Sequence, residues 1–213
     1  MPRKASAREE QRGRPPEPWG SFLKALDDLL KEPVDLHCID GFVITMMYGL
    51  SRTTADIDVL AASPNEKLVE LQDLAGQGSD LHRRFKIYLQ PAPNPGYPED
   101  YESRLVRMWP RFQLKHLRLY ALEVHDLALT KLERNADVDR QDVLALVHAG
   151  YLDQATLRER YVREFRPILA SGAEKHDLTL ELWAEMCWPR QERPGRFTMP
   201  PSTDTSWEGA RNW

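Results

Sequence analysis

Cysteine is scarce in this chain, which has only Cys38 and Cys187 among 213 residues. Their positions, one in an expected strand and one near the end, provide neither a disulfide framework nor the ligand spacing of a zinc site. No run of about 18 apolar residues occurs, so we expect no membrane-spanning helix. Residues 1–20 are charged, rich in proline and without an apolar stretch, which argues against a signal peptide. We therefore expect a cytoplasmic protein with no membrane partner.

The chain also has no excess of positive charge: it contains 29 Lys and Arg residues and 33 Asp and Glu residues, which give a net charge of −4. The chain as a whole has no electrostatic attraction to nucleic acid or anionic lipid. Basic residues nevertheless gather in its middle part: Arg83, Arg84, Lys86, Arg104, Arg107, Arg111, Lys115 and Arg118. Such a segment is typical of a solvated surface. Contact with an RNA backbone or a partner is the alternative, because phosphate binding depends on local charge.

The two ends of the chain differ from its middle. Residues 1–19 contain five basic and three acidic residues and little to bury, which predicts a disordered basic arm. Residues 189–213 are rich in proline and predict an irregular tail, either free or docked on the body through Trp207 and Trp213. Between these ends we expect one domain with two parts: an α/β core over 20–125 and a helical part over 126–188. The hydrophobic content of 41% suggests one core rather than two.

The pattern of apolar residues predicts a mixture of strands and helices. Short segments rich in β-forming residues predict strands over 34–39, 54–60, 85–89 and within 112–123. Helical spacing predicts helices over 21–32, 127–134, 140–148, 154–166 and 177–187. Ser63, Pro64 and Glu66 resemble the start of a helix that ends near residue 75. Residues 41–49 are apolar throughout and favour a short buried helix, with a strand as the alternative. This order predicts an α+β fold: a mixed sheet with flanking helices and a helical C-terminal half.

Asp56 and Asp58 are the strongest candidates for chemistry. Residues two apart on a strand point to the same face, and two carboxylates there repel each other unless a cation lies between them. Mg²⁺ suits such a pair because it prefers oxygen ligands and is often shared with substrate phosphates. The same spacing also occurs at 137 and 139, and the alternative interpretation is the solvated face of an edge strand.

The residues that precede this pair fit a phosphate ligand. Gly41 lies in a turn between a strand and an apolar helix, where backbone N–H groups can approach an anion closely. Arg52 and Thr53 lie shortly before the two carboxylates, and a guanidinium and a hydroxyl there suit a triphosphate with its metal. The alternatives are an ordinary strand-to-helix turn and a structural Arg–Asp pair.

Residues 36–60, LHCIDGFVITMMYGLSRTTADIDVL, resemble the first motif of the minimal nucleotidyltransferase superfamily: small residues, an apolar helix, an Arg-x-Thr step and D-x-D on a strand. Within it, the chain is similar to an uncharacterised bacterial domain family akin to abortive-infection-type toxins. The resemblance covers about residues 20–188 and includes LHRRFKIYLQ (81–90), YESRL (101–105), DLALTKLERN (126–135), DVDRQDVLAL (137–146) and YLDQATLRERYVREFRP (151–167).

The resemblance implies a role for each candidate residue. Asp56 and Asp58 would hold Mg²⁺ and a nucleoside triphosphate, and Gly41 would help to cradle the phosphates. Arg52 and Thr53 would support that end of the site. Lys131 would contact the phosphates, and Asp139 or Asp142 would complete the acidic cluster as a metal ligand or as the base for the attacking hydroxyl. The reaction would transfer an NMP group from an NTP to a hydroxyl of tRNA, another RNA or a protein. The enzyme would be the toxin of a pair with an antitoxin protein.

The chain departs from the family pattern at Asp40, where a small residue is expected. A carboxylate there repels phosphate. Three outcomes are possible: the Asp40 side chain points away from the phosphates, it weakens triphosphate binding, or it has abolished the activity. A catalytically impaired protein that senses nucleotide or binds a partner is therefore the alternative function. A third strand-borne carboxylate is also hard to place, since Glu123 is the only candidate and lacks the family context.

The second block of candidates has simpler interpretations as well. Asp126 and Asp139 stand where helix N-caps are expected, and Asp139 with Asp142 resembles a capping box. Lys131 and Arg134 fit a solvated basic face. The sequence therefore leaves open whether this block belongs to a site with Asp56 and Asp58.

Overall fold

A computed structural model describes residues 13–50, 54–93, 96–169 and 172–189. Its centre is a mixed sheet of five strands in the order β3-β2-β1-β5-β4. The strands are β1 (Val34–Ile39), β2 (Asp56–Ser63), β3 (Tyr88–Pro91), β4 (Val106–Arg107) and β5 (Leu117–Ala121). β1 runs antiparallel to β2 and parallel to β5, while β2 and β3 are parallel. The predicted mixed sheet within an α+β fold is confirmed.

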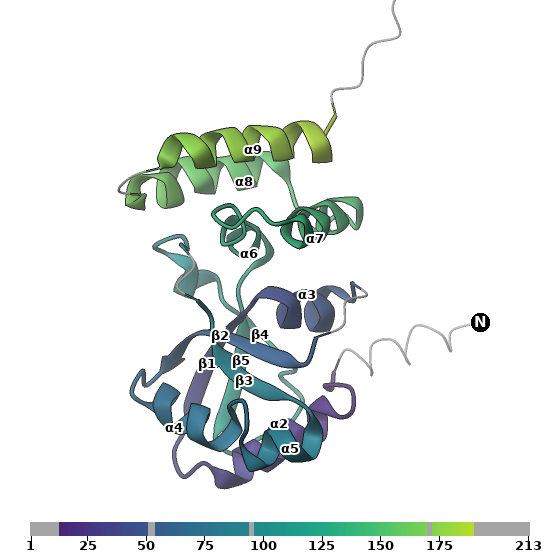
Figure 1. The fold of residues 1–213 in the computed structure, drawn as a ribbon, viewed down its shortest axis with the longest axis vertical. Helices are drawn as coiled ribbons and strands as arrows, with labels where there is room; N and C mark the ends of the chain where they lie inside the picture. Colours follow the sequence, from purple (N-terminus) through teal and green to yellow (C-terminus); the bar gives the residue numbers. More distant parts are fainter. Residues whose placement is uncertain (1–12, 51–53, 94–95, 170–171, 190–213) are drawn as a thin grey trace, which may run out of the picture.

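Helices of the N-terminal half cover the lower side of the sheet in Figure 1. They are α2 (Trp19–Leu29), α4 (Lys67–Ala75) and α5 (Asp80–Phe85). The predicted start of α4 at Ser63 is wrong, because β2 continues through Ser63 and the helix begins at Lys67. Helix α5 was not predicted from the apolar pattern, although Ser79 caps it by accepting the His82 N–H at 3.1 Å.

Helix α3 (Asp40–Tyr48) follows β1 without an intervening loop. Gly49 ends it in the left-handed conformation at φ 67°, which glycine adopts without steric cost. Of the two interpretations of residues 41–49, the short helix is therefore confirmed. The helix places its first turn, with Asp40 and Gly41, at the end of β1.

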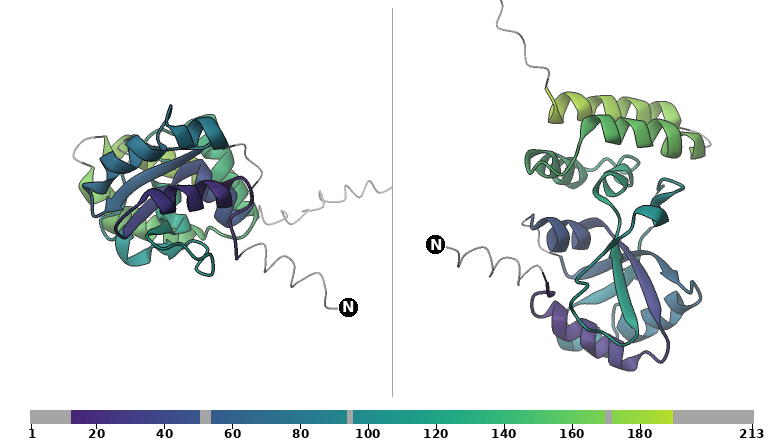
Figure 2. Two further views of the ribbon diagram at one scale, coloured as in Figure 1. Left: turned by 90° about the horizontal axis from the view of Figure 1, so that it is seen from below. Right: turned by 180° about the vertical axis from the view of Figure 1, so that it is seen from behind.

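The C-terminal half forms a helical layer above the sheet, and the view from behind shows the same arrangement (Figures 1 and 2). Its elements are α6 (Val124–Leu129), α7 (Asp137–His148), α8 (Gln154–Arg160), the π-helical η2 (Tyr161–Phe165), the 3-10 turn η3 (Arg166–Ile168) and α9 (Ala173–Cys187). A further 3-10 turn, η1 (Tyr101–Arg104), precedes β4. The predicted helical C-terminal half is confirmed, but α6 and α7 each begin three residues earlier than expected.

Among the residues that the structure describes, the buried apolar side chains form two clusters, so the expectation of one core is wrong. The first cluster, which includes Leu36 and Ile57, lies between the sheet and the N-terminal helices. The second, which includes Trp183, lies among the C-terminal helices. Tyr48 and Leu50 pack against both clusters. The two clusters therefore meet at the C-terminal end of α3.

The expected arm and tail fall largely outside the described residues. The choice between a free tail and one docked through Trp207 and Trp213 lies outside the described residues, as do residues 1–12 of the arm. Trp19, which was assigned to the arm, begins α2 and is buried at 6% exposure. None of the helices in the described part of the chain is long and apolar enough to cross a bilayer.

Candidate active site

Asp56 and Asp58 share one face of β2, as the alternating pattern predicted. Ile57, between the two aspartates, and Val59, after Asp58, point to the other face and are fully buried in the first cluster. Asp56 and Asp58 are partly exposed on the opposite face. The carboxylates are therefore held by a well-packed strand while their oxygens remain accessible.

Gln90 joins the two carboxylates. It lies on β3 directly beside Asp58 in the parallel register. Its amide Nε2 donates to Asp56 Oδ2 and to Asp58 Oδ1, at 2.8 Å in each case. Thr54 donates its hydroxyl to the other Asp56 oxygen at 2.9 Å. One oxygen from each aspartate therefore points to a single position in front of the sheet.

Asp40 occupies the turn where the family pattern expects a small residue. Its φ of 58° lies in the left-handed region, which glycine adopts readily and which Asp tolerates better than most residues. Its carboxylate accepts hydrogen bonds from Lys131 Nζ and, at 3.1 Å, from Arg134 Nη2. The side chain therefore contacts the segment after α6.

Lys131 lies at the centre of a second acidic cluster. The side chain is 2% exposed, and its Nζ is 3.3 Å from Asp139 and 3.1 Å from Asp142 as well as bonded to Asp40. The three aspartates each offer an oxygen within 4.8 Å of the others, which is close enough for a metal ion. The ammonium of Lys131 already provides the positive charge there, and Arg134 adds a second cation at Asp139 and Asp40.

The two cations favour the ionised form of the Asp40 and Asp139 carboxylates. Burial alone would raise the pKa of Asp40, but the charges of Lys131 and Arg134 and their hydrogen bonds lower it below the ordinary value. For Asp139, burial is likewise outweighed by Arg134, Lys131 and the Ala136 N–H, and its pKa is lowered. The cluster is therefore an ion network that ties the β1–α3 turn to the segment between α6 and α7.

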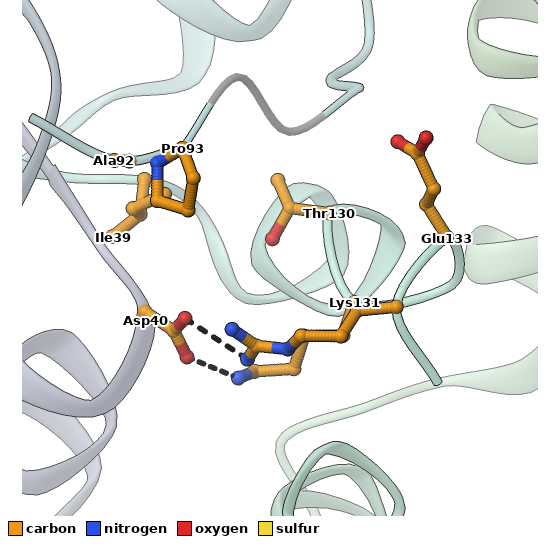
Figure 3. Close-up of a pocket in the computed structure, with 8 residues that line it drawn as sticks. Ile39, Asp40, Ala92, Pro93, Thr130, Lys131 and Glu133 are labelled. Atoms are coloured by element: carbon orange, nitrogen blue, oxygen red, sulfur yellow. Dashed lines mark hydrogen bonds and ion pairs between the residues drawn. The ribbon is translucent and has the colours of Figure 1, made fainter. Parts of the chain in front are cut away.

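A pocket of about 180 Å³ lies beside this network (Figure 3). Its lining comes from the end of β1, the segment after β3 and the turn after α6: Ile39, Asp40, Ala92, Pro93, Thr130, Lys131, Glu133 and Arg134. Figure 3 shows Lys131 reaching Asp40 from the turn after α6. Asp58 lies between Ile39 and Gln90 in the sheet, so the Asp56/Asp58 pair is next to two of the segments that form the pocket.

The predicted site residues thus fall into two neighbouring groups. Asp56 and Asp58 meet through Gln90, whereas Asp40, Asp139 and Asp142 meet around Lys131. Gly41 is buried in the first turn of α3. Arg52 and Thr53 lie outside the described residues.

The capping interpretation of Asp126 and Asp139 is wrong in detail. Glu123 and Ala136 are the N-cap residues of α6 and α7, and each aspartate lies three positions later. Asp139 still accepts the Ala136 N–H at 3.0 Å. The predicted Asp139–Asp142 capping box is replaced by the contacts of both with Lys131.

Glu123 belongs to a different polar group from the candidate site. It follows β5, accepts the His125 N–H at 3.0 Å and pairs with Arg160. Burial would raise its pKa, but His125 and Arg160 lower it to about 2. Glu123 therefore links α6 to α8.

Gln90 was missed as a site residue. The predicted strand over 85–89 stopped before it, whereas β3 runs from Tyr88 to Pro91. The signal was the alternation of Tyr88, Leu89 and Gln90, in which the apolar residue is buried and the two polar residues are partly exposed.

Comparisons with known proteins support one family. A search of curated proteins and a search of solved structures both found no match to the chain. Residues 23–186, which span most of the 213 residues, match the family described as "Nucleotidyltransferase of unknown function (DUF6036)". A nucleoside triphosphate is the substrate that this description implies. The matched region includes both carboxylate groups and the pocket, and the chain belongs to this nucleotidyltransferase family.

Proposed function

We propose that the protein is a Mg²⁺-dependent nucleotidyltransferase that transfers an NMP group from an NTP to a hydroxyl of RNA or protein. The observation that carries this proposal is the convergence of one oxygen of Asp56 and one of Asp58 on the same amide nitrogen of Gln90. Membership of the nucleotidyltransferase family supports the reaction class.

The Asp56/Asp58 pair fits Mg²⁺. Oxygens from both carboxylates lie 2.8 Å from the same Gln90 nitrogen, so both can be directed at one cation. Mg²⁺ commonly takes one or two protein carboxylates and completes its shell with water and substrate phosphates. When bound, it would neutralise charge that develops on the phosphate oxygens during transfer.

The second acidic cluster is a poorer metal site. The Lys131 ammonium lies within bonding distance of all three aspartates and is covalently part of the chain. A divalent cation placed there would be repelled by Lys131 and Arg134. We therefore assign Asp139 and Asp142 to the positioning of Lys131, in place of the expected role as metal ligand or base.

We place the triphosphate in the pocket. Lys131 and Arg134 line the pocket, and their positive side chains would pair with the negatively charged phosphates. Gly41 would allow the phosphates to approach the backbone at the first turn of α3. Arg52 and Thr53 keep the supporting role that the family resemblance implies. The acceptor hydroxyl would attack the α-phosphate in line with the leaving pyrophosphate.

We extend the proposal to a toxin that modifies tRNA or another RNA and is neutralised by an antitoxin protein. The support is the resemblance to abortive-infection-type toxins. A distinct alternative is a nucleotide-sensing or partner-binding protein with impaired catalysis. The ion pairs of Asp40 with Lys131 and Arg134 favour this alternative, because a triphosphate would have to replace Asp40 as the partner of these two cations.

The test is transfer of label from each of the four NTPs to a tRNA pool or to protein in the presence of Mg²⁺. We expect transfer by the wild type and a loss of at least about a hundredfold in Asp56→Asn, since the metal would lose a carboxylate ligand. Asp80→Asn is the matched control, because the Asp80 side chain is 93% exposed on α5.

Two results would contradict the enzyme proposal. The first is absence of label transfer by a folded wild-type protein with every NTP. The second is equal transfer by the wild type and Asp56→Asn. Binding of Mg²⁺–ATP or Mg²⁺–GTP without any transfer would support the nucleotide-sensing alternative.

A further inference from the structure

We propose that Gln90 is a neutral occupant of the metal position, which holds Asp56 and Asp58 together and competes with the divalent cation. This inference rests on the proposed function, because it assumes that the two aspartates bind the metal. It assigns Gln90 a role in setting how tightly the metal binds.

The first observation is the position of the amide nitrogen. Gln90 Nε2 lies 2.8 Å from one oxygen of each aspartate. An ion held by the same two oxygens would have to lie between them, where this N–H group now lies. Since a donor cannot remain in contact with a cation, the amide must move or rotate when the ion enters.

The second observation is that the sheet builds this contact. Asp56 is paired with Tyr88 and Asp58 with Gln90 across the parallel β2–β3 ladder. Leu89, between the two β3 residues, is buried at 1% exposure. Because Leu89 fixes which face Gln90 occupies, the amide is directed at the carboxylates by strand register.

The chemistry of an amide suits this position better than the other common side chains. A lysine there would permanently neutralise one of the two negative charges of Asp56 and Asp58, and its ammonium would exclude a metal cation. A glutamate would add a third negative charge and increase repulsion in the metal-free protein. The amide offers two donors without a net charge, so the pair stays ordered and still attracts a divalent ion.

Thr54 supports the same arrangement. Its hydroxyl donates to Asp56 Oδ1 at 2.9 Å, which leaves Oδ2 for Gln90. The two donors therefore fix the orientation of the Asp56 carboxylate. Metal binding at Oδ2 requires the loss of the Gln90 contact alone and does not require the loss of the Thr54 contact.

The experiment is calorimetric titration of the full-length chain with Mg²⁺ or Mn²⁺ alone, without nucleotide. In Gln90→Met the side chain keeps its length but loses both hydrogen bonds to the carboxylates. We expect the metal to bind about tenfold more tightly than to the wild type, since these charge-assisted bonds no longer have to be broken. Gln72→Met, at an exposed position of α4, should match the wild type.

A second variant covers the case in which Gln90→Met does not fold. Gln90→Asn retains an amide but is one methylene shorter, so it should lose the bridge and also tighten metal binding. Unchanged binding in the folded variants would overturn the inference. Weaker binding would also overturn it, because it would make Gln90 a metal ligand and not a competitor.

Failure of the inference and failure of the proposed function can be distinguished with Asp56→Asn. If this variant binds metal as well as the wild type does, the proposed metal site is wrong and the inference falls with it. If Asp56→Asn loses binding while Gln90→Met equals the wild type, the metal site stands and only the role of Gln90 is wrong.

Discussion

At the scale of single residues, Asp40 combines an unfavourable backbone conformation with favourable side-chain contacts. A non-glycine residue at φ 58° costs roughly 1 kcal/mol relative to glycine, although Asp is among the better tolerated. The ion pairs with Lys131 and Arg134 offset this cost. The carboxylate therefore acts as an internal anion for the two cations of the pocket.

We expect Asp40→Gly to bind Mg²⁺–ATP about tenfold more tightly than the wild type, because Lys131 and Arg134 each lose one of the carboxylates with which they pair. Calorimetry with Mg²⁺–ATP and Mg²⁺–GTP measures the effect. Asp40→Asn removes the charge but tolerates the same backbone, so its affinity should change in the same direction. Unchanged affinity in both variants would show that the two cations do not receive the nucleotide.

At the scale of elements, Glu123 connects two helices of the C-terminal half. It caps α6 by accepting the His125 N–H and pairs with Arg160 at the end of α8. Its pKa is about 2, compared with an ordinary value of 4.5. Because the pKa is lowered in the folded state, Glu123 stabilises the fold fully above pH 4.5 and loses this contribution as the pH falls toward 2.

We expect Glu123→Gln to lower the free energy of unfolding at pH 7 by about 2 kcal/mol and to reduce the loss of stability on acidification. Urea unfolding at several pH values from neutral to acidic measures both effects. Glu99→Gln serves as a control at an exposed position. An identical acid dependence in wild type and Glu123→Gln would contradict the lowered pKa of this carboxyl.

At the scale of the whole molecule, the sheet with its N-terminal helices and the C-terminal helices have separate apolar clusters. Contacts that cross between them include Tyr48 and Leu50, which pack on both, and the pairing of Asp40 with Lys131. The pocket lies at this junction, since β1 and the turn after α6 both line it. The site therefore depends on how the two parts are held together.

These contacts predict that the two parts unfold in one transition. Hydrogen exchange in increasing urea should show that amides of β1, in the first cluster, and of α9, in the second, lose protection at the same urea concentration. Loss of protection in α9 at a clearly lower concentration would show that the C-terminal helices unfold separately.

The sequence alone predicted β1, β2 and the shared face of Asp56 and Asp58, whereas residues 41–49 favoured a short helix with a strand as the alternative. These predictions depend on local rules: a strand places alternate residues on one face, and an apolar segment bounded by a turn forms a buried element. The fold class could be predicted from the order of such elements. Helix starts were less accurate, although Ser63, Asp126 and Asp139 resemble caps. Ser63 is the last residue of β2, and the N-caps of α6 and α7 are three residues before Asp126 and Asp139.

The grouping of the site residues was decided only by the tertiary structure. Gln90 reaches Asp56 across 34 residues of sequence because β3 lies beside β2, and Lys131 reaches Asp40 across 91 residues because α6 ends near the first turn of α3. No local pattern records such distances, since they depend on strand order and on the packing of one apolar cluster against another. The sequence determined which carboxylates are available, and the fold determined which cation or amide each of them meets.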